Sequence, residues 1–301
     1  MFKYWTVWSF IEGVARTGSI TTLAYVGLSS ASLWQLVLAT LIIGSVQMCI
    51  SAFVAKMSNT RLWLGKEFLS WCIVFGFFAT AGTILPLIAL GPLGGDLSTY
   101  VFIAVGLAIV PGAIADWVFF GTRLRSKDFL GLMIACTAAY LVIGLPSLQE
   151  LAKLPAWTVI ALFGMCAVVG NRLITRRLAL LGERTWQKAF VQNMYVGLTT
   201  LALCAFALVF VDGTSGSIDA RFVLGASVVG VFVILLVGSN LLAFESGASI
   251  AAKEAFTLCV FFFGTAAAGA IFLHQQISWF EVAGFMLYGF AYMFLRREVA
   301  R

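Results

Sequence analysis

The feature that most constrains this chain is a succession of apolar stretches, each long enough to cross a bilayer as a helix. A spanning helix needs about 20 mostly apolar residues, and turn or charge signals separate one stretch from the next. The stretches cover residues 4–26, 33–55, 67–89, 98–120, 128–145, 155–175, 188–211, 222–243, 249–273 and 278–296. We therefore predict an all-α integral membrane protein with ten transmembrane helices.

Composition supports a membrane location. Of the 301 residues, 61% are hydrophobic and 11% are charged, whereas about a quarter of the residues in a soluble domain are charged. A soluble chain of this length could not hide so much apolar surface, but lipid can cover it. The net charge of +6 does not require a nucleic-acid partner, because basic residues mark the cytoplasmic face of membrane proteins.

The basic residues predict the orientation. With the N-terminus placed inside, only Lys153 and Arg221 fall in outside segments, while Arg16 and Lys253 lie within spans. This bias predicts that both termini are cytoplasmic. The basic residues assigned to inside segments are Lys3, Lys56, Arg61, Lys66, Arg123, Arg125, Lys127, Arg172, Arg176, Arg177, Arg184, Lys188, Arg296, Arg297 and Arg301.

The two halves of the sequence share the spacing of several motifs. Phe119 and Gly131 in the first half are separated as Phe272 and Gly284 are in the second. A Trp-Thr-Val triplet also stands near the start of each half. These matches predict an internal repeat of five helices, with residues 1–150 as the first copy and residues 151–301 as the second.

An odd number of helices per copy means that the second copy is inverted in the membrane. Charge agrees with this, because the loop at residues 123–127 is basic whereas its counterpart at residues 274–278 has no formal charge. Inverted repeats place a substrate site at their interface in many secondary transporters. We therefore predict two inverted five-helix repeats around a central cavity.

Two stretches of the sequence resemble a known family. Residues 98–144, which contain Pro111-Gly112, the run from Trp117 to Gly121, and Gly131, are similar to residues 249–295. Both resemble the helix pairs that end each half of the ten-helix drug/metabolite transporter superfamily, in its EamA-like branch. The resemblance implies a secondary transporter of the bacterial inner membrane that works by alternating access.

The sequence also departs from this family. Thr122 and Gln275 stand where many relatives carry a glutamate. The Gly-Ala-Leu-Asn-Lys run of nucleotide-sugar carriers is absent from the sequence. The resemblance therefore implies the fold and the transport mode, and leaves the solute open.

Polar residues in the first span share one helical face. Trp8, Glu12, Arg16 and Ser19 follow one another at intervals of three or four positions, and Ser9 lies three positions before Glu12. A charge near the bilayer centre costs about 2.5–3.5 kcal/mol on insertion scales, so it normally faces a cavity or a partner. We predict that this face lines a solute cavity, with Trp8, Glu12 and Arg16 as substrate contacts.

Glu12 and Arg16 allow two interpretations. An acid four residues before a base is a favourable helical ion pair, which would have a purely structural role. Alternatively, Glu12 binds a proton or a substrate cation, and Arg16 binds an anionic group of the solute. Small multidrug relatives use a glutamate in the first helix, but Arg16 favours the ionised form of Glu12 and opposes proton uptake.

The ninth span begins with a second pair of charges. Lys253 and Glu254 are adjacent, and adjacent residues point about 100° apart on a helix, so we expect them not to face the same neighbour. The favoured interpretation is that Lys253 extends to the membrane interface. In the alternative, Lys253 or Glu254 faces the cavity and contacts substrate.

Four further residues of the predicted spans carry specific expectations. Asn240, near the end of span eight, either bonds to a neighbouring helix, which is the favoured interpretation, or contacts the solute. Asp116 is expected to be a solvated carboxylate close to Arg123. Pro86 and Pro111 interrupt spans three and four, where each would permit a bend during gating.

The leading functional hypothesis is a secondary transporter or exporter of a small polar metabolite, such as an amino acid or a similar zwitterion. The expected partners are this solute and membrane lipid, with no cofactor, metal or nucleic acid, and both coupling to a proton and uncoupled facilitated diffusion stay open. The expected assembly is a monomer or a weak homodimer. No P-loop is present for ATP hydrolysis, and one histidine without paired acids argues against an enzyme.

Two alternatives remain. A proton-coupled exporter of cationic drugs would need an acid without a basic partner, so it predicts that Arg16 points away from Glu12. A non-transporting membrane partner protein is the other alternative.

Overall fold

The computed structural model describes residues 4–25, 32–90, 93, 100, 102–142, 156–182, 185–211, 218–272 and 278–295. Several residues used in the sequence predictions lie outside these ranges. They are Lys3, Lys153, Arg184, Gln275, Arg296, Arg297 and Arg301.

The described part of the chain is helical, as predicted. Its elements are α1 (Trp5–Tyr25), α2 (Leu33–Met57), α3 (Lys66–Leu90), the π-helical turn η2 (Phe102–Gly106), α5 (Ile109–Phe120), α6 (Ser126–Val142), α8 (Ala156–Leu180), α9 (Trp186–Leu208), α10 (Ala220–Glu245), α11 (Ile250–Phe272) and α12 (Trp279–Leu295). These ten α-helices of the described residues follow the ten predicted spans within a few residues, except that span four is divided.

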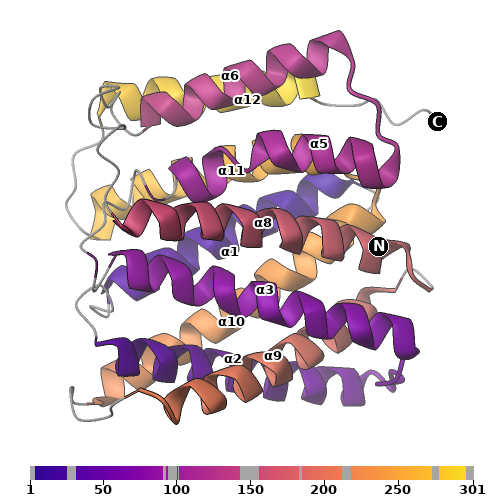
Figure 1. The fold of residues 1–301 in the computed structure, drawn as a ribbon, viewed down its shortest axis with the longest axis vertical. Coiled ribbons are helices and arrows are strands. Elements are labelled where there is room, and N and C mark those ends of the chain that lie inside the picture. Colours follow the sequence, from indigo (N-terminus) through magenta and orange to yellow (C-terminus); the bar gives the residue numbers. More distant parts are fainter. Residues whose placement is uncertain are drawn as a thin grey trace.

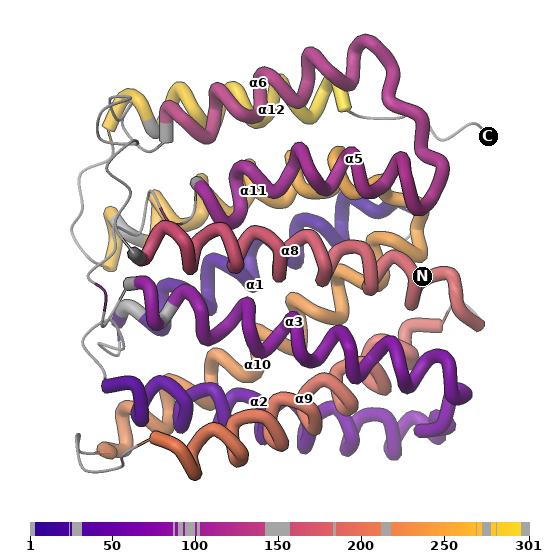
Figure 2. The backbone as a smooth tube through the Cα atoms, in the orientation of Figure 1, coloured from indigo at the N-terminus to yellow at the C-terminus, as the bar shows by residue number. Residues whose placement is uncertain are grey.

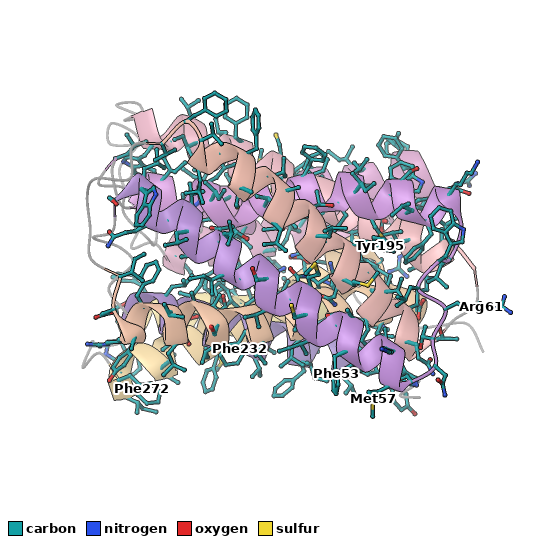
Figure 3. The ribbon with its side chains drawn as sticks, turned by 90° about the horizontal axis from the view of Figure 1, so that it is seen from below. Phe53, Met57, Arg61, Tyr195, Phe232 and Phe272 are labelled. Atoms are coloured by element: carbon teal, nitrogen blue, oxygen red, sulfur yellow. The ribbon has the colours of Figure 1, made fainter. Side chains whose placement is uncertain are left out.

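Seven segments of the described chain are long and apolar enough to cross a membrane. Of the remaining helices, α6 and α12 have 17 residues each, and α1 carries the charges of Glu12 and Arg16. The outer surface is correspondingly apolar. Phe53 and Phe272, which are 64% and 61% exposed, project away from the bundle (Figure 3). Because water disfavours such a surface, the chain is an integral membrane protein.

Helices from the two halves of the chain pack side by side. In Figure 2 the pair α6 and α12 lies at one edge of the bundle, and the pair α2 and α9 lies at the opposite edge. Between these pairs, α1 packs against α10 and α11, and α3 packs against α8. The first helix begins and the last helix ends on the same side of the bundle, which is the right side of Figure 1.

The α2–α9 pair depends on close backbone contact. A Cβ atom added at Gly197 would lie 2.7 Å from the backbone nitrogen of Met48 and 2.8 Å from the carbonyl oxygen of Gly44. Beside this crossing, Gln47 Nε2 donates a hydrogen bond of 2.8 Å to Asn193 Oδ1. Small residues of this kind let membrane helices approach closely without a hydrophobic driving force.

We expect Gly197→Ala to lower the thermal unfolding midpoint of the purified protein. The new methyl group would meet backbone atoms that no side-chain rotation can move, and overpacking of this kind costs about 1–3 kcal/mol. Gly289→Ala is the matched control, since an added Cβ there meets nothing within 4 Å. Equal midpoints for the two variants would contradict close contact between α2 and α9.

The two prolines that were predicted to permit gating lie in different surroundings. Pro86 is inside α3, about one turn before its end, as predicted. Span four is interrupted as predicted, and Pro111 lies in the first turn of α5, directly after the interruption. The irregular part of this span is the π-helical turn η2 and the two residues that separate it from α5.

Candidate functional site

Five charged side chains from three helices meet inside the bundle. Glu12 and Arg16 come from α1, Arg172 from α8, and Lys253 and Glu254 from α11. Their side chains are 11% exposed or less. We call this group the five-residue ion cluster.

Glu12 contacts all three cations of the cluster. Its Oε1 accepts a hydrogen bond of 2.7 Å from Arg16 Nη2 and lies 3.5 Å from Arg172 Nη2. Its Oε2 forms an ion pair with Lys253 Nζ at 2.5 Å. The structural ion pair predicted for Glu12 and Arg16 is therefore present, but it is one part of a larger network.

Glu254 contacts the same three cations. Arg172 donates from Nη2 to Glu254 Oε2 at 3.0 Å, and its Nε also pairs with Oε1. Lys253 Nζ lies 3.0 Å from Glu254 Oε1, and Arg16 Nη2 lies 3.6 Å from Glu254 Oε2. Each carboxylate is thus surrounded by all three cations.

The cluster lies far from the helix ends on α1 and α8. Glu12 is the eighth of the 21 residues of α1, roughly 10 Å from its start at 1.5 Å per residue. Arg172 stands eight residues before the end of α8, which is roughly 12 Å. Charges at such depth require partners or a polar cavity, and here they partner one another.

The structure corrects two expectations for α11. Lys253 does not extend to the membrane interface, because its side chain is fully buried and its Nζ lies 5.3 Å from the centre of the Phe244 ring. The expectation that Lys253 and Glu254 face different neighbours is also wrong, because both side chains turn toward α1. Their length compensates for the angle between adjacent helical positions, so Lys253 reaches Glu12 while Glu254 reaches Arg16.

Arg172 was missed as a site residue. Counting it among the basic residues of an inside segment assigned it to the membrane surface, whereas it is 5% exposed and lies within α8. One signal could have found it. Arg172 falls inside the predicted span at residues 155–175, where an unpartnered cation is costly.

The aromatic and hydroxyl residues of the predicted α1 face lie beside the cluster. Ser9 is fully buried, and its Oγ has no hydrogen-bond partner among the described residues. Its carbonyl oxygen accepts from Thr257 Oγ1 at 3.5 Å, one turn along α11 from Glu254. Trp8, predicted to contact substrate, packs partly buried against the hydrophobic core.

Asp116 joins α5 to two other helices. It forms an ion pair with Arg176 of α8, and its Oδ2 accepts the backbone N–H of Ile250, at the start of α11, at 3.1 Å. Arg176 also donates to Thr122 at 3.1 Å. The expectation of a solvated carboxylate near Arg123 is wrong, because Asp116 is only 2% exposed.

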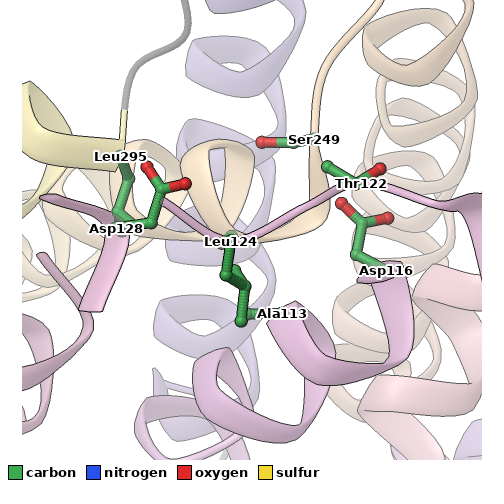
Figure 4. A pocket seen from close by; sticks show the side chains of 8 residues that line it. Ala113, Asp116, Thr122, Leu124, Asp128, Ser249 and Leu295 are labelled. Carbon is green, nitrogen blue, oxygen red and sulfur yellow. The ribbon is translucent and has the colours of Figure 1, made fainter. Parts of the chain in front are cut away.

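A small pocket opens beside Asp116 (Figure 4). Its volume of about 10 Å³ is enough for about one water molecule. It therefore cannot hold a metabolite in this conformation. The lining residues are Ala113, Asp116, Thr122, Leu124, Asp128, Ser249, Ala251 and Leu295.

Asn240 forms the interhelical bond that was the favoured interpretation. Its Nδ2 donates to Thr175 Oγ1 of α8 at 3.2 Å, one turn beyond Arg172. A further buried ion pair joins Lys188 of α9 to Glu245 of α10 at 2.9 Å. Both contacts connect α10 to its neighbours, and neither adds a residue to the five-residue ion cluster.

Comparisons with known proteins extend the description of the fold. No protein-family model matches the sequence, and no curated protein matches it. The chain is similar to a protein of known crystal structure, with a TM-score of 0.67 and 15% sequence identity over 95% of this chain and 96% of that chain. At this identity the similarity shows a shared fold alone.

Proposed function

We propose that this protein is a secondary transporter that moves a small polar metabolite across the membrane by alternating access. The observation that carries the proposal is the five-residue ion cluster, which three helices bury inside a membrane protein. Intramembrane charges mark substrate or ion pathways in many membrane proteins. Glu12, Arg16, Arg172, Lys253 and Glu254 are the proposed substrate-binding residues.

Helix packing supports the proposal of two inverted repeats at residues 1–150 and 151–301. In the proposed repeat, α1, α2, α3 and α6 correspond to α8, α9, α10 and α12. If each helix is exchanged with its counterpart, the α1–α10 contact becomes the α8–α3 contact. The same exchange leaves the α2–α9 and α6–α12 pairs unchanged, and all four pairs are in contact. Gly44 and Gly197, which meet between α2 and α9, have the same sequence separation as Phe119 and Phe272.

The distribution of basic residues supports cytoplasmic termini. The resemblance of residues 98–144 and 249–295 to the drug/metabolite transporter superfamily supports a bacterial inner membrane. In this orientation the α10–α11 turn and the Asp116–Arg176 pair face the cytoplasmic side. The proposed central site would then exchange access between this side and the opposite one.

The arrangement around Glu12 favours a metabolite over a cationic drug. The drug-exporter alternative predicts that Arg16 points away from Glu12, but Arg16 donates to Glu12 at 2.7 Å. The two carboxylate oxygens of Glu12 are also occupied by contacts to three cations. Proton binding at Glu12 would lose these contacts, so we propose transport that does not depend on protonation of Glu12.

We expect proteoliposomes containing the protein to exchange at least one labelled solute from a pool of amino acids, organic acids and amines. Counterflow against the unlabelled pool detects such exchange without knowing the driving force. We expect the rate to exceed that of empty liposomes and to be insensitive to an imposed pH gradient. Exchange that requires the gradient would favour the proton-coupled alternative, and no exchange of any solute would contradict transport of these classes.

A further inference from the structure

The five-residue ion cluster is not electrically balanced. Arg16, Arg172 and Lys253 carry three positive charges, whereas Glu12 and Glu254 carry two negative charges. Every ion pair that these five side chains make among the described residues joins them to one another. One positive charge is therefore left over in a buried site.

Loss of a proton is an unfavourable way to remove this charge. Arginine stays protonated in proteins, which leaves Lys253 as the group that could become neutral. Lys253 Nζ lies 2.5 Å from Glu12 and 3.0 Å from Glu254. An ammonium group has three N–H donors and no acceptor, so Lys253 is matched to these two carboxylates and is counted here with its formal charge.

A buried excess charge calls for a counterion. Removing a charge from water is unfavourable unless an opposite charge and hydrogen bonds replace the lost hydration. A solute with one net negative charge would supply that partner. A neutral zwitterion would leave the net charge unchanged, and a cationic solute would increase it.

Arg16 is the residue placed to receive the counterion. Its side chain is 11% exposed, the most exposed of the five. Its Nη2 donates to Glu12, while Nε and Nη1 donate to no residue in the described part of the chain. The planar guanidinium suits paired hydrogen bonds to a carboxylate.

A second polar group on the same face of α1 lacks a hydrogen-bond partner. Ser9 is on the same face of α1, one turn before Glu12, and its buried Oγ makes no hydrogen bond within the described residues. A hydroxyl or a carboxylate oxygen of a bound solute would satisfy it. Buried polar groups without partners are uncommon in folded proteins, so Ser9 Oγ is available to a bound solute.

We propose that the solute is a small organic carboxylate with a net charge of −1, bound as the missing counterion of the five-residue ion cluster. This inference rests on the proposed transport function, because it names the class of solute for the same site. Arg16 would contact the carboxylate directly. Ser9, two turns away on the same face of α1, would bond to another polar group of the solute.

The first test compares ligands that are matched in size and differ in charge. Glutamate, glutamine and lysine carry net charges of −1, 0 and +1 at neutral pH, and lactate and pyruvate add two smaller carboxylates. We expect at least one of the three anions to raise the unfolding midpoint of the purified wild-type protein by about 2–4 °C. Glutamine and lysine should leave the midpoint unchanged. If none of the anions raises the midpoint, the proposal is overturned.

Counterflow with the same solutes separates this inference from the proposed function. Exchange of glutamine or lysine without exchange of any anion would support transport and overturn the anion proposal. An anion that stabilises the protein but is not exchanged would support the anion site and contradict transport. Exchange of anions alone is the result that we expect.

Variants of the cluster test the charge argument directly. Lys253→Met brings the cluster to zero net charge, so we expect it to lose the midpoint rise caused by the anion. The double variant Glu12→Gln with Lys253→Met restores the excess positive charge and should regain at least half of the rise. Arg221→Gln, an exposed position on α10 that bonds to Tyr25, is the control and should respond as wild type does. A response retained in Lys253→Met would overturn the proposal, and the wild-type ligand series decides it if a variant fails to fold.

Discussion

Glu12→Gln is expected to destabilise the protein far more than Lys253→Met, although both wild-type side chains are fully buried. The glutamine leaves three cations around one carboxylate, which doubles the excess positive charge. The methionine leaves two cations and two carboxylates, which balances the cluster. Uncompensated buried charge costs about 3–5 kcal/mol when one partner is removed, and only the first variant incurs this cost.

The measurement is the unfolding midpoint of each variant, purified in the same detergent and followed by tryptophan fluorescence. Because both changes remove contacts of similar number and depth, a difference between them reports on charge balance. The double variant with both changes should be more stable than Glu12→Gln alone. Equal losses for the two single variants, or a larger loss for Lys253→Met, would contradict an excess of positive charge in the cluster.

The helices of this fold could be predicted because lipid imposes a strong constraint on the sequence. Hydrophobic length and polar breaks place α2 at residues 33–55 and α10 at residues 222–243, within a few residues of their described bounds. The interruption before α5 could not be predicted in the same way. Pro111 marks the region of the interruption, but the π-helical form of the backbone at η2 depends on packing.

The candidate site could be predicted in part for a related reason. Glu12 and Arg16 share one helix, so their contact follows from helical spacing alone. The partners of Lys253 and Arg172 come from other helices, and no local pattern specifies which helix faces which. The count of basic residues on the cytoplasmic face placed Arg172 at the membrane interface, and the length of the lysine side chain placed Lys253 there. Ion pairs with other helices bury both residues instead.

Asp116 shows the same limit at the end of α5. Its position near a helix terminus predicted solvation, because sequence gives no information on the covering segments. In the fold, Arg176 and the first N–H of α11 replace water around this carboxylate. The N-terminus of a helix stabilises a nearby anion, so the start of α11 is a favourable partner for a buried aspartate.

Arg172→Gln is expected to abolish most transport while leaving the protein folded. The variant has two cations and two carboxylates in the cluster, so it does not create an uncompensated charge. It removes the guanidinium through which α8 contacts both Glu12 and Glu254. Removing one partner from a buried charge pair costs about 2–5 kcal/mol in binding, which corresponds to a fall of about 30-fold or more in exchange at limiting solute.

Matched variants on α8 make this expectation specific. Arg172→Lys keeps the charge but loses the planar pair of donors, so we expect exchange between the rates of wild type and Arg172→Gln. Arg177→Gln removes another arginine of the same helix, whose side chain is 48% exposed and pairs with the exposed Glu67. Because exposed ion pairs contribute little, this control should exchange solute at the wild-type rate. If Arg172→Gln also exchanges solute at that rate while retaining its unfolding midpoint, the cluster has a structural role and the solute binds elsewhere.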